Sequence, residues 1–171
     1  MTIVLCNAGP LIALGKLNRL ELLAELYGQV RIPRAVYDEA ATRGLALGMP
    51  DSRTIHLFWR AKGWPVIEVT AATLTAYEPP VILDPGETEV LALAQTLSDP
   101  LMLLDDETAR AEARRLKLYV RGTLGILAQA YRANILSFPE VELLIQEIAV
   151  RPDIWISAKL CEQTLQALRG S

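Results

Sequence analysis

Short apolar segments alternate with longer amphipathic ones along this chain, and the alternation constrains the fold more than any other feature. Five short apolar segments read as strands, at residues 2–6, 30–32, 66–69, 101–104 and 118–120. Patterns with helical spacing separate them, as over residues 107–116. Buried parallel strands joined by crossover helices give such a pattern. The sequence therefore predicts an α/β fold: a three-layer α/β/α sandwich with a mainly parallel central sheet.

The helical patterns also suggest how the chain is organised. Leucines recur at every third position from Leu11 to Leu26, which predicts two short helices broken near Asn18, with Gly28 as a stop. Residues 44–65 predict a loop with one short helix over 51–62. Two more helical patterns follow Pro139. We expect a single domain over residues 1–171, in which residues 137–171 form a helical extension that packs on the rest.

Charge and residue usage exclude several classes of function. With 17 Lys and Arg against 20 Asp and Glu, the net charge is −3, so any contact with nucleic acid needs a local basic patch. The one histidine and two distant cysteines offer no zinc-binding spacing, and a Ser-His-Asp set would depend on His56 alone. Carboxylates must therefore carry any chemistry.

The same features suggest where the protein works. No apolar run is long enough to span a bilayer, and the first residues lack the basic segment of a signal peptide. We expect a cytoplasmic protein with reduced thiols and no membrane partner.

Polar residues gather at the predicted strand ends and helix starts. They are Asn7, Glu39, Glu87 with Glu89, and Asp105 with Asp106. The carboxyl ends of parallel strands share one edge of a sheet, which is where such folds place their ligands. Oxygen donors without histidine or cysteine suit Mg²⁺ or Mn²⁺. Such ions neutralise phosphodiesters and activate water. The sequence thus predicts a metal site for phosphoryl chemistry.

Five segments carry a family resemblance in the right order and spacing. They are residues 3–14, 32–39, 86–89, 103–106 and 122–125. Here the sequence resembles the PIN-domain nucleases, and within them a prokaryotic subfamily similar to the VapC-type toxins. The resemblance covers residues 2 to about 136 and continues more weakly to Trp155-Ile156-Ser157.

This resemblance implies a metal-dependent endoribonuclease that cleaves RNA with Mg²⁺ or Mn²⁺. The implied catalytic residues are Glu39, Glu87 and Asp105. The implied metal ligands are Asn7, Glu39, Glu87, Asp105 and Asp106, with Glu89 and Thr123 beside them. The chain departs from the family pattern at Asn7, where an aspartate is usual. The resemblance also implies a toxin role and a small antitoxin partner, and together with the apolar helical stripes it predicts a homodimer.

Each of these residues also has a structural explanation. Asp105 and Asp106 can cap the helix that follows, and Glu87 and Glu89 suit the first turn of another. Glu39 can lie on a solvated helix face, and Asn7 before Gly-Pro can be a turn residue that bonds to nearby backbone.

The one basic concentration includes Arg110, Arg114 and Arg121, which we predict as nucleic-acid contacts. Interleaved Glu107 and Glu112 leave open a solvated, ion-paired helix face instead. Phe58, Trp59 and Trp64 are typical of a core, although aromatic rings can also stack on bases.

Two other functions compete with the ribonuclease. A catalytically silent PIN-like module would bind RNA or a protein partner, and Asn7 favours it. A phosphoacceptor receiver domain would use Asp105 and Asp106, but receivers place their acidic pair after the first strand, where this chain has Asn7.

Overall fold

The strands form a parallel sheet, as the sequence predicts. The computed structural model describes all 171 residues. In it, β1 (Val4–Cys6), β4 (Leu101–Leu103) and β5 (Tyr119–Arg121) pair in parallel in the order β1-β4-β5. β2 (Ile32–Pro33) pairs in parallel with β3 (Val66–Ile67). A parallel bridge between Leu5 and Arg31 joins the two groups, so the spatial order is β3-β2-β1-β4-β5.

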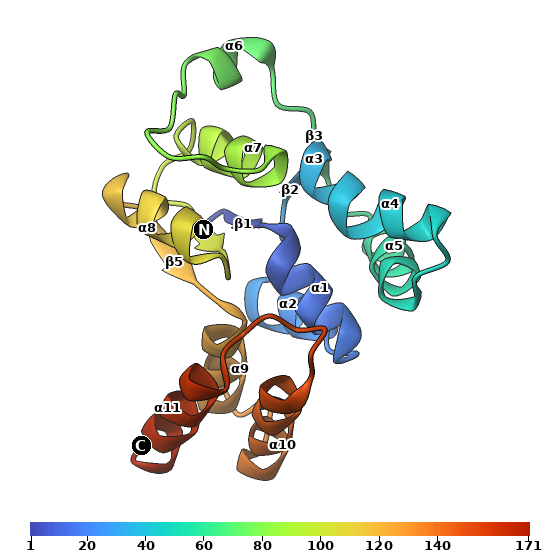
Figure 1. Ribbon diagram of the computed structural model, residues 1–171, viewed down its shortest axis with the longest axis vertical. Coiled ribbons are helices and arrows are strands. Elements are labelled where there is room, and N and C mark those ends of the chain that lie inside the picture. Colours follow the sequence, from blue (N-terminus) through green and yellow to red (C-terminus); the bar gives the residue numbers. More distant parts are fainter.

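Helices flank the sheet and continue beyond it (Figure 1). Before β4 they are α1 (Ala8–Lys16), α2 (Glu21–Tyr27), α3 (Arg34–Tyr37), the π-helical η1 (Asp38–Thr42), α4 (Arg43–Ala46), α5 (Pro50–Lys62), α6 (Ala71–Thr75) and α7 (Pro85–Ala94). After β4 they are α8 (Glu107–Arg115), α9 (Thr123–Arg132), α10 (Phe138–Val150) and α11 (Ala158–Arg169). None of them has both the length and the apolar character to cross a membrane.

Both faces of the sheet are buried, which accounts for the nearly continuous apolar strands. Val4, Cys6 and Leu103 point into a large apolar cluster that includes residues of α1, α5 and α9. Leu5 and Met102 point the opposite way, into a second cluster with α7 and α8. Alternate residues of each strand thus pack into two separate apolar clusters, one on each face of the sheet. The α/β fold with a parallel central sheet and helices on both sides is therefore confirmed.

The helix boundaries differ from the predictions in one region. The break at Asn18 is present, with a positive φ of 55°, and Gly28 ends α2 with φ of 71°. Residues 44–46, however, are helical rather than part of a loop, because η1 joins α3 to α4 without interruption. The π-helical segment adds a residue to the turn and so changes which side chains face the sheet edge. Glu39 lies within it.

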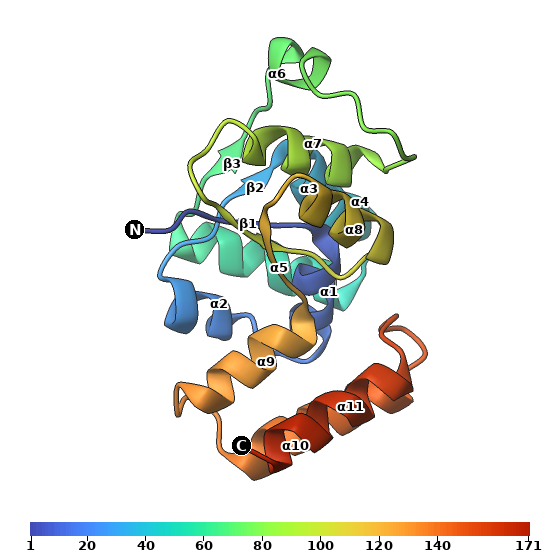
Figure 2. The same cartoon turned by 90° about the vertical axis from the view of Figure 1, so that its left-hand side faces the viewer.

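The C-terminal helices pack on α9 and extend one of the two apolar clusters. Ile145 and Ile148 of α10 and Leu165 and Leu168 of α11 belong to the same cluster as the strand residue Val4. Figure 2 shows α9, α10 and α11 together at one end of the molecule. The link between α10 and α11, residues 151–157, returns from this end toward α1, where it becomes part of the candidate site.

Candidate active site

The candidate site lies where β1 and β4 end side by side. Asn7 directly follows β1, and Asp105 follows β4 after Leu104. The connections from these two strands lead to opposite sides of the sheet, since β2 lies beyond β1 and β5 beyond β4. Parallel α/β sheets bind ligands in the crevice at such a switch point. The topology therefore brings Asn7 and Asp105 to the position where a ligand is expected.

Asn7 is buried and its side-chain oxygen has no partner. It occupies the N-cap position of α1 but makes no side-chain capping bond. Its exposed fraction is 5%, and Oδ1 accepts no hydrogen bond. A buried polar atom without a partner costs free energy, so such atoms often belong to functional sites. A turn or capping role for this side chain is not observed.

Asp105 is fixed in place by the start of α9. Its Oδ1 accepts a hydrogen bond from the Thr123 backbone N–H at 2.7 Å, and its Oδ2 accepts one from Thr123 Oγ1 at 2.5 Å. A Cβ on Gly9 would lie 3.3 Å from Asp105 Cβ, so the aspartate packs against the first turn of α1. Burial nevertheless raises the pKa of Asp105 above its usual range.

Oxygen atoms of Glu39, Asn7 and Asp84 converge on the space beside Gly86. A Cβ at Gly86 would lie 3.0 Å from Glu39 Oε2, 3.4 Å from Asn7 Oδ1 and 3.4 Å from Asp84 Oδ1. Glycine leaves this space open. The pKa of Glu39 is raised by burial and, to a smaller extent, by the charge of Asp84. The chain thus gathers oxygen donors here with little positive charge to balance them.

Glu87 combines a structural role with a strongly raised pKa. It lies in the first turn of α7, where it forms a capping box with Asp84: Glu87 Oε2 accepts from the Asp84 N–H at 3.0 Å. Burial, together with the charges of Asp84, Asp106 and Glu39, raises its pKa to about 7, although the bond from the Asp84 backbone lowers it. Near neutral pH the protein therefore keeps a proton here or requires a cation.

The raised pKa of Glu87 makes stability depend on pH. Because its pKa is about 7 when folded and near the ordinary 4.5 when unfolded, the folded state binds more protons between these values. The free energy of unfolding therefore falls as pH rises through this window. Glu87→Gln keeps the capping acceptor and should raise the melting temperature at pH 8 in EDTA by about 2–4 °C, as roughly 1 kcal/mol does in a chain of this size. Thermal unfolding at pH 8 and pH 4.5 checks this.

The variant and wild type should melt alike at pH 4.5, where Glu87 is protonated in the folded protein. Equal melting temperatures at pH 8 would contradict the raised pKa. Glu142→Gln on α10 is the matched control, because that glutamate pairs with Arg169 at the other end of the molecule.

Two of the predicted carboxylates hold helix ends. Asp106 is exposed, and its Oδ1 caps α8 by accepting from the Ala109 N–H at 2.9 Å. Glu89 Oε2 accepts from the Ala35 N–H at 2.9 Å, which ties α7 to the start of α3. Both bonds match the structural explanation of these residues. The Glu89 bond also steadies α7, which carries Glu87, and the start of the helical segment that carries Glu39.

The predicted arginines lie in three different settings. Arg110 donates from Nη1 to the Leu104 carbonyl at 2.9 Å, which keeps its guanidinium beside Asp105. Arg114 is half exposed and pairs with Glu107 at 3.2 Å. Arg121 donates from Nη1 to Gln129 Oε1 at 2.6 Å and to the Tyr27 hydroxyl at 3.3 Å. All three arginines line one hollow with Asp105, but the guanidinium of Arg121 is already hydrogen-bonded to Tyr27 and Gln129.

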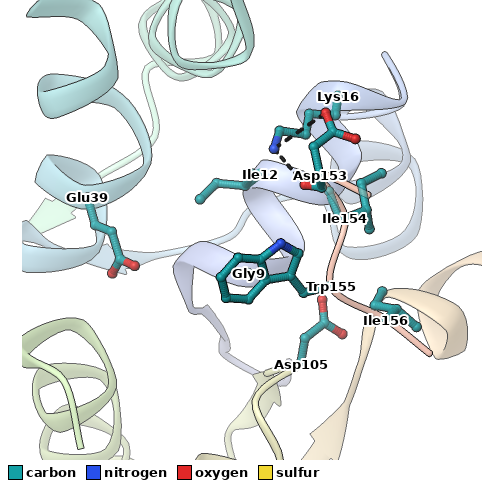
Figure 3. A pocket seen from close by; sticks show the side chains of 10 residues that line it. Gly9, Ile12, Lys16, Glu39, Asp105, Asp153, Ile154, Trp155 and Ile156 are labelled. Carbon is teal, nitrogen blue, oxygen red and sulfur yellow. Dashed lines mark hydrogen bonds and ion pairs between the residues drawn. The ribbon is translucent and has the colours of Figure 1, made fainter. Parts of the chain in front are cut away.

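Two hollows meet at Asp105. One, of about 450 Å³, lies between α1 and the 151–157 link and is lined by Glu39, Asp105, Trp155 and others (Figure 3). The other, of about 510 Å³, lies between α8 and α11 and contains Arg110 and Arg114. Ile156 borders both. A ligand bound at Asp105 would therefore face the apolar and acidic walls of the first hollow on one side. On the other side it would face the arginines of the second hollow.

The donor set fits a hard divalent cation in its chemistry. The unpartnered Asn7 Oδ1 and the raised pKa values of Glu39, Glu87 and Asp105 all describe oxygens that a cation would stabilise. No three His, Cys, Asp or Glu side chains lie close enough together to hold a metal ion. An ion therefore needs Asn7 or a small approach of the carboxylates.

Sequence reasoning missed two parts of this site. Asp84 is not among the predicted ligands, although its carboxylate reaches the space beside Gly86; the Asp-Pro-Gly sequence before Glu87 is the available signal. Trp155 was noted only for its resemblance to a family segment. Its position over the hollow depends on how α10 and α11 pack, and no local pattern encodes that.

Comparison with known proteins agrees with this geometry. The sequence model of a family described as a PIN domain matches residues 3–169. A search of the curated proteins and of the solved structures found no significant match. The family match covers nearly all of the chain. It includes every strand and the acidic residues at the sheet edge, from Glu39 to Asp106. This chain, with its parallel sheet and its oxygen-lined switch point, belongs to the PIN-domain family.

Proposed function

We propose that the protein is an endoribonuclease that hydrolyses RNA phosphodiester bonds with the help of Mg²⁺ or Mn²⁺. PIN domains are associated with nuclease activity in general, and this proposal names the substrate and the cofactor. The observation that carries it is the buried, unpartnered Asn7 Oδ1, which lies with Glu39 and Asp84 around the open space beside Gly86. An oxygen with no donor among its neighbours suits a cation as its partner.

In this proposal Asn7, Glu39, Glu87 and Asp105 would hold the metal. The bound ion would neutralise the phosphodiester and lower the pKa of an attacking water. Thr123 holds both oxygens of Asp105 by hydrogen bonds, so that this carboxylate stays oriented. The N-terminus of α1 lies against Asp105 and favours negative charge there through the helix dipole.

The basic hollow beside Asp105 supports an RNA backbone as the bound group. Arg110 is held near Asp105 by its bond to the Leu104 carbonyl, and Arg114 lies one helical turn further along α8. Guanidinium groups at this spacing suit adjacent phosphates. Because the net charge of the chain is −3, the protein as a whole does not attract RNA, and the phosphates would be attracted locally by the arginines of this hollow.

Chelation tests the proposal. We expect a mixture of single-stranded and structured RNAs to be cleaved in Mn²⁺ and to remain intact in EDTA, with activity restored when Mn²⁺ is added back. Cleavage that persists in EDTA would contradict the metal mechanism. A parallel sample of the Asp105→Asn protein shows whether any residual cleavage comes from a contaminating nuclease.

The second candidate function is a catalytically silent PIN module that binds RNA or a protein. It is favoured by Asn7, which supplies no charge, and by the separation of the carboxylates. Absence of Mn²⁺-dependent cleavage together with measurable RNA binding would support this candidate over the ribonuclease.

A toxin role with a small antitoxin, and a homodimer, are further proposals. The VapC-type resemblance supports the toxin role. The exposed Leu143, Val150 and Leu160 on α10 and α11 offer apolar surface for a second protein chain.

A further inference from the structure

Trp155 is the one tryptophan of this chain that the fold leaves in solvent. Its exposed fraction is 93%, against 3% for Trp59 and 8% for Trp64. Those two rings pack edge to face with centroids 5.1 Å apart, so they belong to the core and are not available to a ligand. A fully exposed indole does not contribute the large favourable free energy that burial of its apolar surface would give. An exposed tryptophan beside the candidate site therefore calls for a functional explanation.

The backbone presents this indole in a defined place. Trp155 is at the centre of a tight three-residue turn in which the Ile156 N–H donates to the Ile154 carbonyl at 3.0 Å. Ile154 is 5% exposed and belongs to the main apolar cluster, and Ile156 packs against it. Buried Ile154 and partly buried Ile156 thus anchor the turn on its two sides, and the tryptophan between them points outward.

Ion pairs tie the same link to α1. Arg151 forms two hydrogen bonds with the Asp153 carboxylate, at 2.8 Å and 2.7 Å, and donates to the Lys16 carbonyl at 3.2 Å. Lys16 Nζ donates in return to the Asp153 carbonyl at 2.7 Å. The 151–157 link is therefore fastened at the C-terminal end of α1, the helix whose first turn packs against Asp105.

The indole shares its hollow with the candidate metal ligands. Trp155, Glu39 and Asp105 line one cavity of about 450 Å³, whose other walls are mostly apolar (Figure 3). This volume is within the range of about 300–1,000 Å³ that is usual for small-molecule sites. A flat aromatic ring over apolar walls, next to carboxylates that would hold a cation, suits a nucleobase whose phosphate reaches that cation.

Resting on the proposed function, we propose that Trp155 is a stacking platform for one unpaired base of the RNA, next to the phosphate that is cleaved. Bases inside a duplex are stacked on one another and cannot offer a free face to the ring. The substrate class is therefore a single-stranded segment, such as a loop or an unpaired end. Stacking of this kind tolerates any base, so the platform selects strandedness more than sequence.

Fluorescence in EDTA tests the platform without requiring activity. Titrating wild type with a single-stranded hexa-adenylate at low salt should quench the exposed Trp155, and a blunt, GC-rich duplex long enough to stay paired under the same conditions should not. Trp155→Ala should weaken binding of the hexamer, followed by anisotropy of a labelled strand, about 5- to 150-fold, the range for loss of one stacked base. Trp155→Phe should retain most of the affinity.

Two control variants distinguish stacking on the indole from nonspecific apolar binding. Trp155→Leu keeps apolar area without a π face and should bind as weakly as Trp155→Ala. Leu57→Ala removes an apolar side chain that is 53% exposed on α5, outside both hollows, and should leave the affinity for the hexamer unchanged. Full affinity in Trp155→Leu would overturn the stacking platform and point to an apolar surface for a protein partner. Equal quenching by the duplex would overturn it too.

The platform and the ribonuclease proposal fail in different ways. Metal-dependent cleavage with hexamer affinity and KM unchanged in Trp155→Ala would reject the platform alone. Quenching by the hexamer that Trp155→Ala abolishes, in a protein that neither binds Mn²⁺ nor cleaves RNA, would support the platform and reject the ribonuclease.

Discussion

Asp105→Asn should lower kcat/KM for Mn²⁺-dependent RNA cleavage by a factor on the order of 100 or more, the scale set by losing several kcal/mol of charge stabilisation at a metal site. The change removes one negative charge from a half-buried group, where attraction to a divalent ion is weakly screened. Asparagine keeps an oxygen that can accept from the Thr123 N–H. Steady-state cleavage of one defined RNA over a range of Mn²⁺ concentrations measures the effect.

Stability separates this effect from unfolding. Burial raises the pKa of Asp105, so the metal-free protein gains by losing that charge, and its melting temperature in EDTA should not fall. Asp99→Asn is the matched control, because Asp99 precedes β4 at the opposite end of the strand, and its φ of 46° suits asparagine. Full activity in Asp105→Asn, or a comparable loss in Asp99→Asn, would contradict the assignment of Asp105.

Asn7→Asp should have the opposite effect on metal affinity. The new carboxylate would replace a buried neutral oxygen beside Glu39 and Asp84, and Mn²⁺ should bind about tenfold more tightly, a gain of roughly 1.4 kcal/mol. Without metal, the like charges repel one another and burial disfavours the new charge. The melting temperature should therefore fall in EDTA and rise further on adding Mn²⁺ than it does for wild type. Thermal unfolding with and without Mn²⁺ measures both changes.

Cleavage by Asn7→Asp should also increase, since the charge that is usual in active PIN nucleases is then present. Asn18→Asp serves as its control: Asn18 lies between α1 and α2, outside both hollows that contain Asp105. A lower metal affinity in Asn7→Asp would show that Asn7 is a structural residue.

The positions of Asn7 and Asp105 could be predicted because they depend only on strand ends. Once residues 2–6 and 101–104 read as parallel strands, their carboxyl ends had to share an edge of the sheet. The receiver-domain alternative used the same edge, but the family match and the acidic residues around Gly86 favour the PIN fold instead.

Other features depend on packing that a local pattern does not contain. Glu39 reaches the site from a π-helical segment, whose extra residue per turn breaks the ordinary helical spacing. Arg121 lines the hollow that contains Arg110 and Arg114, but its hydrogen bonds to Tyr27 and Gln129 depend on how α2 and α9 pack against β5. Trp155 is brought to Asp105 by the return of the 151–157 link to α1, across more than a hundred residues of sequence.

Calorimetric titration of Mn²⁺ into wild type, Asp105→Asn and Asn7→Asp decides whether these residues bind a metal ion, because it measures the metal site without RNA. We expect Asn7→Asp to bind most tightly, wild type less tightly, and Asp105→Asn weakly or not at all. The contradictory result is an unchanged affinity in Asp105→Asn or a weaker one in Asn7→Asp, and either would reduce these residues to helix-start and turn positions.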